Sequence, residues 1–134
     1  MPKTLPAHIL IVDDDPQIRA LLQEYFSSKE LRVNVASSGK EMAEILVHHS
    51  IDLIVLDRRL AGEDSMVLAR KVRAEFAIPI IILTGLRDDA DRAMILGLGA
   101  ADYLTKPFSP RELLTRVQMV LRRIRGQAPT ETTQ

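Results

Sequence analysis

The sequence contains no cysteine, no excess of either charge and no long apolar run. The absence of cysteine excludes disulfide bonds and thiolate metal sites, and it suits a reducing compartment such as the cytoplasm. Eighteen basic and eighteen acidic side chains cancel, so net charge gives no indication of binding to nucleic acid or to an acidic membrane. No apolar run approaches the roughly 20 residues that span a bilayer, so no membrane association is predicted.

What is present fits one compact domain. The chain has 134 residues, of which 46% are hydrophobic and 27% charged, an ordinary globular balance. Residues 1–7 hold no long apolar stretch, so no secretory signal is expected and a cytoplasmic location is predicted. We expect a domain over residues 1–125, followed at 126–134 by a linker or disordered tail without an apolar anchor.

Five short segments are predicted to be β-strands. Residues 9–12, 53–56 and 80–83 are apolar at successive positions and rich in β-branched side chains, which is typical of strands buried on both faces. Residues 33–36 alternate in character and are predicted to lie nearer an edge of the sheet. Residues 102–105 form a short fifth candidate.

Apolar residues at helical spacing predict helices between and after these strands. The predicted buried faces consist of Ile18, Leu21, Leu22, Tyr25 and Phe26, then Met42, Ile45 and Leu46, then Leu68, Val72 and Phe76, and finally Leu113, Val117, Val120, Leu121 and Ile124. The order βαβαβαβαβα predicts an α/β fold, a parallel sheet with helices on both faces.

Helix boundaries have their own signals. The predicted N-terminal caps are Asp15 before Pro16, and the capping boxes Ser38 with Glu41 and Ser109 with Glu112. Gly97 and Gly99 are placed to end the fourth helix.

Polar side chains gather where the predicted strands end, which is where open α/β sheets bind ligands. The residues after the first, third, fourth and fifth strands include Asp13, Asp14, Asp15, Asp57, Thr84 and Lys106. If the first and third strands are neighbours, Asp13, Asp14 and Asp57 share one pocket. Crowded carboxylates favour a hard divalent cation such as Mg²⁺. With a lysine to contact phosphate, an aspartate can then form an acyl phosphate.

Each of these residues also has a structural interpretation. Asp15 is predicted to cap a helix rather than to bind a ligand, Thr84 alone would suit a turn, and Lys106 alone would suit a solvated surface. Their joint occurrence at one edge of the sheet favours the functional interpretation.

Four segments resemble the signature segments of receiver domains in bacterial two-component response regulators: residues 11–16, 56–57, 83–85 and 103–108. The resemblance covers about residues 8–123, and the last helix is most similar to OmpR/PhoB-type receivers. It implies a doubly wound (βα)5 fold with five parallel strands in the flavodoxin-like order 2-1-3-4-5, which the chemotaxis receivers share.

The resemblance also implies a role for each matching residue. Asp57 would be the phosphoacceptor, Lys106 would contact the phosphoryl group, and Thr84 with Tyr103 would form a switch pair. Mg²⁺ would be held by Asp13, Asp14, Asp57 and the backbone carbonyl of Arg59. The Lys106–Pro107 bond is expected to be cis.

The implied function is signalling rather than enzymatic turnover. A sensor histidine kinase would donate the phosphoryl group, and the face formed by the fourth helix, fifth strand and fifth helix would change shape. The output is expected to be transcription, with DNA bound only through an output domain outside this chain.

OmpR/PhoB-type receivers pair through that same face across a two-fold axis. Carried over by position, the reciprocal ion pairs are Arg92 with Glu112 and Asp102 with Arg116, whereas Ala101 occupies a further acidic position of the pattern. A weak, salt-sensitive homodimer after phosphorylation is therefore expected.

The loop after Asp57 departs from the family pattern. Ala61 replaces a usual proline and Ser65 a frequent glycine, so a less rigid loop is expected. Arg58 and Arg59 are unusual there and are predicted to be solvated. Alternatively, Arg59 reaches over the phosphoryl group or pairs with Glu63.

Two other functions remain open at this point. A phosphohydrolase of the haloacid dehalogenase type also uses a strand-end aspartate and Mg²⁺, but it needs a second aspartate two residues after the nucleophile. That position is Arg59 after Asp57, and after Asp13 it is Asp15, which is predicted to cap a helix. A phosphate-independent pseudo-receiver is the other alternative. Such modules usually lack one of the acids or the lysine, and this chain lacks none.

Overall fold

The computed structural model describes residues 5–85 and 89–124. The predicted tail at 126–134 lies outside these residues. The elements are, in order, β1 (His8–Val12), α1 (Pro16–Ser27), β2 (Arg32–Ala36), α2 (Gly39–His48), β3 (Leu53–Asp57), β4 (Arg59–Leu60), β5 (Glu63–Asp64), α3 (Ser65–Phe76), β6 (Ile80–Thr84), α4 (Asp89–Gly97), β7 (Asp102–Thr105) and α5 (Pro110–Ile124).

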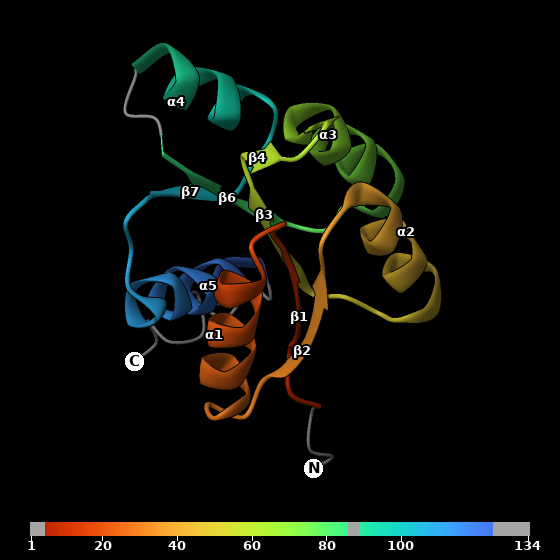
Figure 1. Cartoon of the computed structure of the whole chain (residues 1–134), viewed down its shortest axis with the longest axis vertical. Helices are drawn as coiled ribbons and strands as arrows, with labels where there is room; N and C mark the ends of the chain where they lie inside the picture. The colour runs from red at the N-terminus through yellow and green to blue at the C-terminus, as the bar shows by residue number, and fades with distance from the viewer. Residues whose placement is uncertain (1–4, 86–88, 125–134) are drawn as a thin grey trace.

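Five parallel strands form one sheet in the order β2-β1-β3-β6-β7 (Figure 1). Because β4 and β5 form a separate hairpin, this is the predicted order 2-1-3-4-5. The register places Val12 of β1 opposite Leu56 of β3, and Asp57 opposite Leu83 of β6. The carboxyl ends of β1 and β3 therefore lie side by side.

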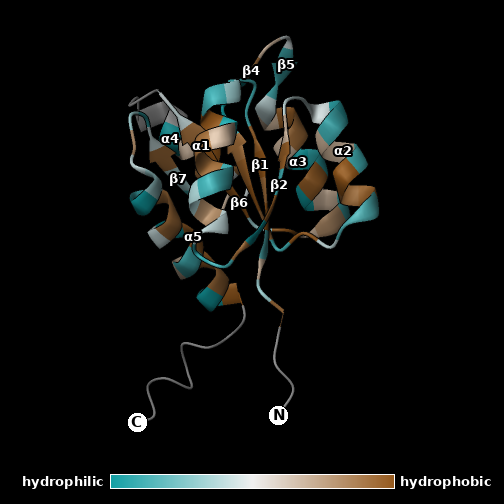
Figure 2. Cartoon of the chain, turned by 60° about the horizontal axis from the view of Figure 1, so that its bottom comes forward, coloured by the Kyte–Doolittle hydropathy of each residue, from teal (hydrophilic) through white to brown (hydrophobic). Residues whose placement is uncertain are grey.

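Helices cover both faces of this sheet (Figure 1). Ile9 and Ile11 of β1 point into a core cluster shared with α1 and α5, whereas Leu10 and Val12 point into a second cluster shared with α2 and α3. Side chains alternate between the two faces along a strand, so a strand covered on both sides is apolar at every position. Figure 2 shows this distribution, with hydrophobic strands between helices that turn their hydrophilic residues outward.

The structure confirms the predicted strands and helices but corrects three core residues. Leu21 is 48% exposed, Phe76 is 42% exposed and Ile124 is 61% exposed. Phe76 and Ile124 are the last residues of their helices, and Leu21 lies on the edge of a face centred on Leu22 and Phe26, which are fully buried. In the described ranges, no helix has the length and apolar character needed to cross a bilayer.

The predicted capping residues Asp15, Ser38 and Ser109 each accept a backbone N–H, but in the described residues neither Glu41 nor Glu112 closes its predicted capping box. The Asp15 side chain accepts from the N–H of Gln17 at 2.9 Å, and Ser38 accepts from the N–H of Glu41 at 3.2 Å. The Glu41 carboxylate accepts from the N–H and hydroxyl of Ser37 instead of closing the box on Ser38. Those two bonds lower the pKa of the exposed Glu41. Ser109 accepts from the N–H of Glu112 at 3.0 Å, and Gly99, with a φ of +93°, follows α4.

The loop after Asp57 forms a short antiparallel hairpin, β4–β5. In the hairpin ladder Arg59 lies opposite Asp64, and Gly62 supplies the positive φ of +71° at the turn. Glu63 does not pair with Arg59, because its carboxylate accepts from the N–H of Gly39 at the start of α2, at 3.0 and 3.1 Å.

Candidate functional site

Three carboxylates meet at the carboxyl edge of the sheet. Asp13 follows β1 and Asp57 ends β3, and the pairing of Val12 with Leu56 sets them beside each other. One oxygen from each of Asp13, Asp14 and Asp57 lies within 4.8 Å of the others. Asp13 and Asp57 are buried, with 0% and 4% exposure, whereas Asp14 is exposed. The structure thus brings together the three acids that the sequence places at neighbouring strand ends.

The Asp57 carboxylate has a donor on each oxygen. Lys106 Nζ lies 3.0 Å from Oδ2, and the Arg59 N–H donates to Oδ1 at 3.1 Å. Lys106 is held by its own N–H, which donates to the backbone oxygen of Thr84 at 2.7 Å, and it precedes a cis bond to Pro107 as expected. The Lys106 side chain is 35% exposed, so part of it is open to solvent.

Asp13 is the least satisfied of the acids. Its Oδ1 accepts from the N–H of Asp15 at 2.9 Å, but its buried Oδ2 has no hydrogen-bond partner within the part of the chain that the structure describes. Burial raises the pKa of Asp13 to about 6, and repulsion from the Asp57 carboxylate adds to the rise, although the Asp15 N–H and Lys106 oppose it. An orphaned carboxylate oxygen among other oxygen donors is suited to a hard cation.

The neighbouring acids have different surroundings. Asp14 Oδ2 accepts from the N–H of Ala61 at 3.0 Å, which links the exposed acid to the β4–β5 hairpin. Asp15 caps α1 through Gln17. Asp15 therefore has the structural role predicted for it.

Thr84 and Tyr103 lie on one face of the sheet. Thr84 ends β6 and is 2% exposed. Tyr103 of β7 is opposite Ile82, two residues before Thr84, and residues two apart along a strand share a face. The Tyr103 ring is partly buried, and the Arg92 guanidinium lies 5.5 Å from its centroid.

The four residues expected on the dimer face lie on α4, β7 and α5. Arg116 Nη1 donates to both carboxylate oxygens of Asp102, each at 3.0 Å. This pair, expected across a two-fold axis, is thus already formed within the single chain. Glu112 is exposed in the first turn of α5, and Arg92 lies against Tyr103.

Two contacts at the site carried no signal in the sequence. The buried Ser65 hydroxyl donates to the backbone oxygen of Asp57 at 2.6 Å, and Arg19 of α1 donates to the backbone oxygen of Asp13 at 2.8 Å. Ser65 was notable in the sequence only as a replacement for glycine. Both contacts depend on how a helix sits against a strand end, which no local pattern encodes.

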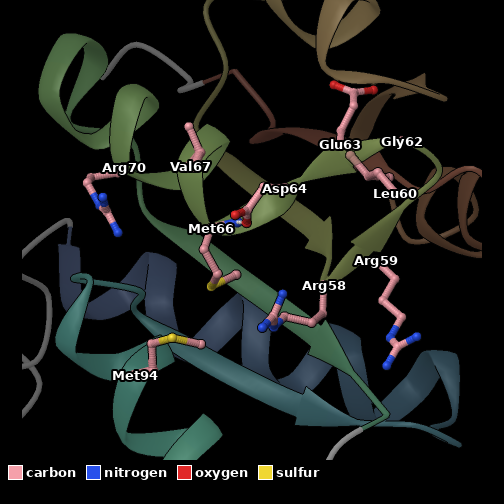
Figure 3. Close-up of a pocket in the computed structure, with 10 residues that line it drawn as sticks. All are labelled: Arg58, Arg59, Leu60, Gly62, Glu63, Asp64, Met66, Val67, Arg70 and Met94. Carbon is pink, nitrogen blue, oxygen red and sulfur yellow. Dashed lines mark hydrogen bonds between the residues drawn. The ribbon is translucent and has the colours of Figure 1, made fainter.

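A groove of about 710 Å³ opens beside the hairpin, between α3 and α4. Figure 3 shows Arg59 and Glu63 pointing in opposite directions from the hairpin, whereas Arg58 points toward Met66 and Met94. The expected solvated position of Arg59 is confirmed, since it is exposed. Arg58 is only partly exposed, so its expected solvation is corrected.

A family model, the response regulator receiver domain, matches residues 9–118. The chain belongs to this family. Receiver domains are signalling domains, and the match replaces the phosphohydrolase alternative.

Curated relatives of this receiver domain are transcriptional regulators. The probable transcriptional regulator ycf27 of Cyanidium caldarium is 47% identical over 117 residues, which cover 87% of this chain and 47% of that protein. The TorCAD operon transcriptional regulatory protein TorR of Escherichia coli (strain K12) is 43% identical over 120 residues, covering 90% of this chain and 52% of that protein. The receiver domain therefore spans about half the length of these relatives.

The fold has close counterparts among solved structures. The receiver domain of the TMAO respiratory system response regulator TorR superposes with a TM-score of 0.84 at 44% identity, covering 89% of this chain and 99% of that one. The predicted flavodoxin-like (βα)5 fold is confirmed.

Proposed function

We propose that this receiver domain accepts a phosphoryl group on Asp57. The observation that carries the proposal is the setting of its carboxylate, which lies between the Lys106 ammonium at 3.0 Å and the Arg59 N–H at 3.1 Å, beside two further acids. Lys106 and the buried Thr84 are proposed to contact the phosphoryl oxygens. An acceptor needs a nucleophilic oxygen, and it needs fixed cations and donors for the charge on the transferred group.

Mg²⁺ is the proposed cofactor, held by Asp13, Asp14, Asp57 and the backbone carbonyl of Arg59. The donor set fits a hard cation, because all four ligands are oxygens and Asp13 Oδ2 is buried without a partner in the described residues. When bound, Mg²⁺ supplies positive charge that offsets repulsion between the carboxylates and an incoming phosphate.

The proposed donor is the phosphohistidine of a sensor histidine kinase. One carboxylate oxygen of Asp57 forms a bond to phosphorus as the donor's P–N bond breaks, and the electron pair leaves with the imidazole nitrogen. Lys106 then faces a phosphoryl oxygen instead of the free carboxylate. The step resembles other transfers in which positioning and charge do most of the work.

Intact mass after incubation with Mg²⁺ and acetyl phosphate tests this assignment. We expect a gain of one phosphoryl group, which Asp57→Asn abolishes and Asp14→Asn reduces. Asp15→Asn is the matched control, because Asp15 is also an exposed acid after β1 but caps α1. Labelling of Asp57→Asn would refute the acceptor. No labelling of the wild type by acetyl phosphate or kinase would favour the pseudo-receiver alternative.

The switch proposed for this domain begins at Thr84. Its hydroxyl would turn toward the phosphoryl oxygens, and Tyr103, on the same sheet face, would move into the vacated space. Because the Tyr103 ring packs against Arg92, this movement changes the α4–β7–α5 face. A shift in population between two pre-existing conformations describes this change as well as an induced change does.

A weak homodimer through that face is the proposed consequence of phosphorylation. Arg92 would meet Glu112 of the partner subunit, whereas Asp102 and Arg116 must exchange their intrachain pair for an intersubunit one. Exchanging an intrachain ion pair for an intersubunit one adds little to the free energy of dimerisation. Exposed ion pairs are worth only about 0.2–1 kcal/mol each. Ala101 leaves a further position without an acid.

Sedimentation of the phosphorylated domain at two salt concentrations tests the dimer. Ala101→Asp should tighten association, with each new pair counted twice by the two-fold axis, by up to about thirtyfold in dissociation constant. A tight dimer that responds neither to salt nor to this substitution would point to another face.

The proposed output is transcription, because the relatives above are transcriptional regulators of about twice this length. DNA binding would then belong to a part of the protein beyond the receiver fold. A reporter gene under control of the full-length product, with and without Asp57→Asn, measures whether phosphorylation controls it.

A further inference from the structure

The peptide unit that follows Asp57 is held from both sides. Its carbonyl oxygen accepts from the Ser65 hydroxyl at 2.6 Å, and its N–H, that of Arg58, donates to the backbone oxygen of Leu83 at 2.7 Å. Ser65 is the first residue of α3, and Leu83 lies in β6 opposite Asp57. Two different elements therefore fix the plane of this one peptide.

Capping of α3 does not account for the Ser65 hydroxyl. Asp64 is the capping residue, and its side chain accepts from the N–H of Met66 at 3.0 Å. The Ser65 side chain is fully buried, at 0% exposure, and its bond to the Asp57 oxygen is at the short end of the range for hydroxyl donors. The hydroxyl thus serves the strand end that carries the candidate acceptor.

We propose that Ser65 is a positioning residue for phosphoryl transfer to Asp57, an inference that rests on the proposed function. The carboxylate and the held peptide diverge from the same Cα atom, and the next N–H along the chain, that of Arg59, donates to Oδ1. A carbonyl that lost its donor would turn toward other donors, and both the carboxylate and the Arg59 N–H would turn with it.

Ser65 touches none of the reacting atoms. During transfer, one Asp57 oxygen forms the P–O bond while the donor's P–N bond breaks and the nitrogen keeps the electron pair and takes a proton. The Ser65 hydroxyl acts on the alignment of that oxygen with phosphorus. Alignment governs the maximal rate rather than the binding of metal or donor.

The test compares the whole chain with Ser65→Ala, Ser65→Cys and a matched control, Ser38→Ala. The control also removes a serine hydroxyl at a helix start, where it accepts from the Glu41 N–H. Phosphoramidate is the donor, and quenched samples are followed by intact mass, so that the maximal rate constant and the KM for the donor are separated. Mg²⁺ affinity without donor is measured by ¹⁵N NMR titration.

We expect Ser65→Ala to lower the maximal rate constant on the order of tenfold, with the donor KM and the Mg²⁺ affinity unchanged. Ser65→Cys, with a weaker donor, should lie between Ser65→Ala and the wild type, and Ser38→Ala should match the wild type. The Arg58 amide resonance should shift in Ser65→Ala, because that amide shares the held peptide.

A wild-type rate in Ser65→Ala would overturn the inference, as would a matching loss of Mg²⁺ affinity, since the whole site would then be distorted. If Ser65→Ala does not unfold cooperatively, Ser65→Cys is judged by the same criteria. Labelling of Asp57→Asn would instead overturn the proposed function, so the two failures are distinguishable.

Discussion

Replacing Asp13 by asparagine should stabilise the metal-free receiver domain at neutral pH. In the folded chain the pKa of Asp13 is raised from 3.8 to about 6, first by burial and also by the Asp57 carboxylate. At neutral pH the ionised group therefore sits in unfavourable surroundings. Asparagine has nearly the same shape, carries no charge and keeps an oxygen for the N–H of Asp15, which Asp13 accepts at 2.9 Å.

The direction in which the unfolding free energy changes with pH follows from how many protons the folded and unfolded states bind. An acid with a higher pKa in the folded state binds more protons when folded, so the unfolding free energy falls as pH rises between the two values. For Asp13 that window runs from 3.8 to about 6. A rise of the pKa from 3.8 to about 6 corresponds to a loss of about 3 kcal/mol of folding free energy when Asp13 is ionised. This loss is complete well above pH 6. Water entry and structural relaxation reduce this loss. We therefore expect Asp13→Asn to raise the unfolding free energy by about 1–3 kcal/mol at pH 7.5.

Urea unfolding in a chelator, followed by circular dichroism because the chain has no tryptophan, measures this gain. The difference should vanish near pH 4. Asp15→Asn is the control and should change little, because asparagine caps helices as well as aspartate does. Mg²⁺ at ten times its dissociation constant should stabilise the wild type by about 1.4 kcal/mol and the variant much less. Equal or lower stability of metal-free Asp13→Asn at pH 7.5 would refute the reasoning.

Gly39→Ala should destabilise the domain by about 0.5–1.5 kcal/mol in urea unfolding, because an added Cβ would push the Glu63 carboxylate away from the Gly39 N–H and crowd Leu68 Cδ2 at 2.9 Å. A loss below about 0.5 kcal/mol, typical of surface changes, would contradict this close approach. Phe26→Ala should cost about 3–5 kcal/mol, whereas Phe76→Ala should cost far less, because Phe26 is fully buried and Phe76 is 42% exposed. Equal losses of stability would indicate that Phe76 is buried as the sequence periodicity predicts, contrary to its observed exposure.

The fold was predictable where burial is symmetrical. Strands covered on both faces must be apolar at every position, so β1, β3 and β6 stand out in the sequence. Helix faces were less certain at their edges. Periodicity shows which side of a helix is apolar but not where the sheet beneath it ends. Phe76 and Ile124 were therefore predicted to be buried although they are exposed. The β4–β5 hairpin has two residues in each strand, too few for any period to appear.

The gathering of acids and lysine was predictable because parallel strands deliver their carboxyl ends to one edge. The contacts that orient those groups were not. Ser65 reaches Asp57 only because α3 begins against the end of β3, and Glu63 reaches Gly39 across 24 residues. The pairing of Asp102 with Arg116 within one chain likewise depends on the crossing of β7 and α5. Tertiary placement, rather than local pattern, decides each of these contacts.

The three consecutive acids after β1 show how the two levels combine. Asp13 is buried with an orphaned oxygen, Asp14 is exposed and accepts from Ala61, and Asp15 caps α1. The sequence places all three acids at the carboxyl edge of the sheet, but their side chains have different surroundings because α1 begins directly after them at Pro16. Asp13 is held where burial and the Asp57 carboxylate make its charge unfavourable. Groups that destabilise a ligand-free site gain most from a bound cation, so Asp13 is the acid through which Mg²⁺ would stabilise this domain most strongly.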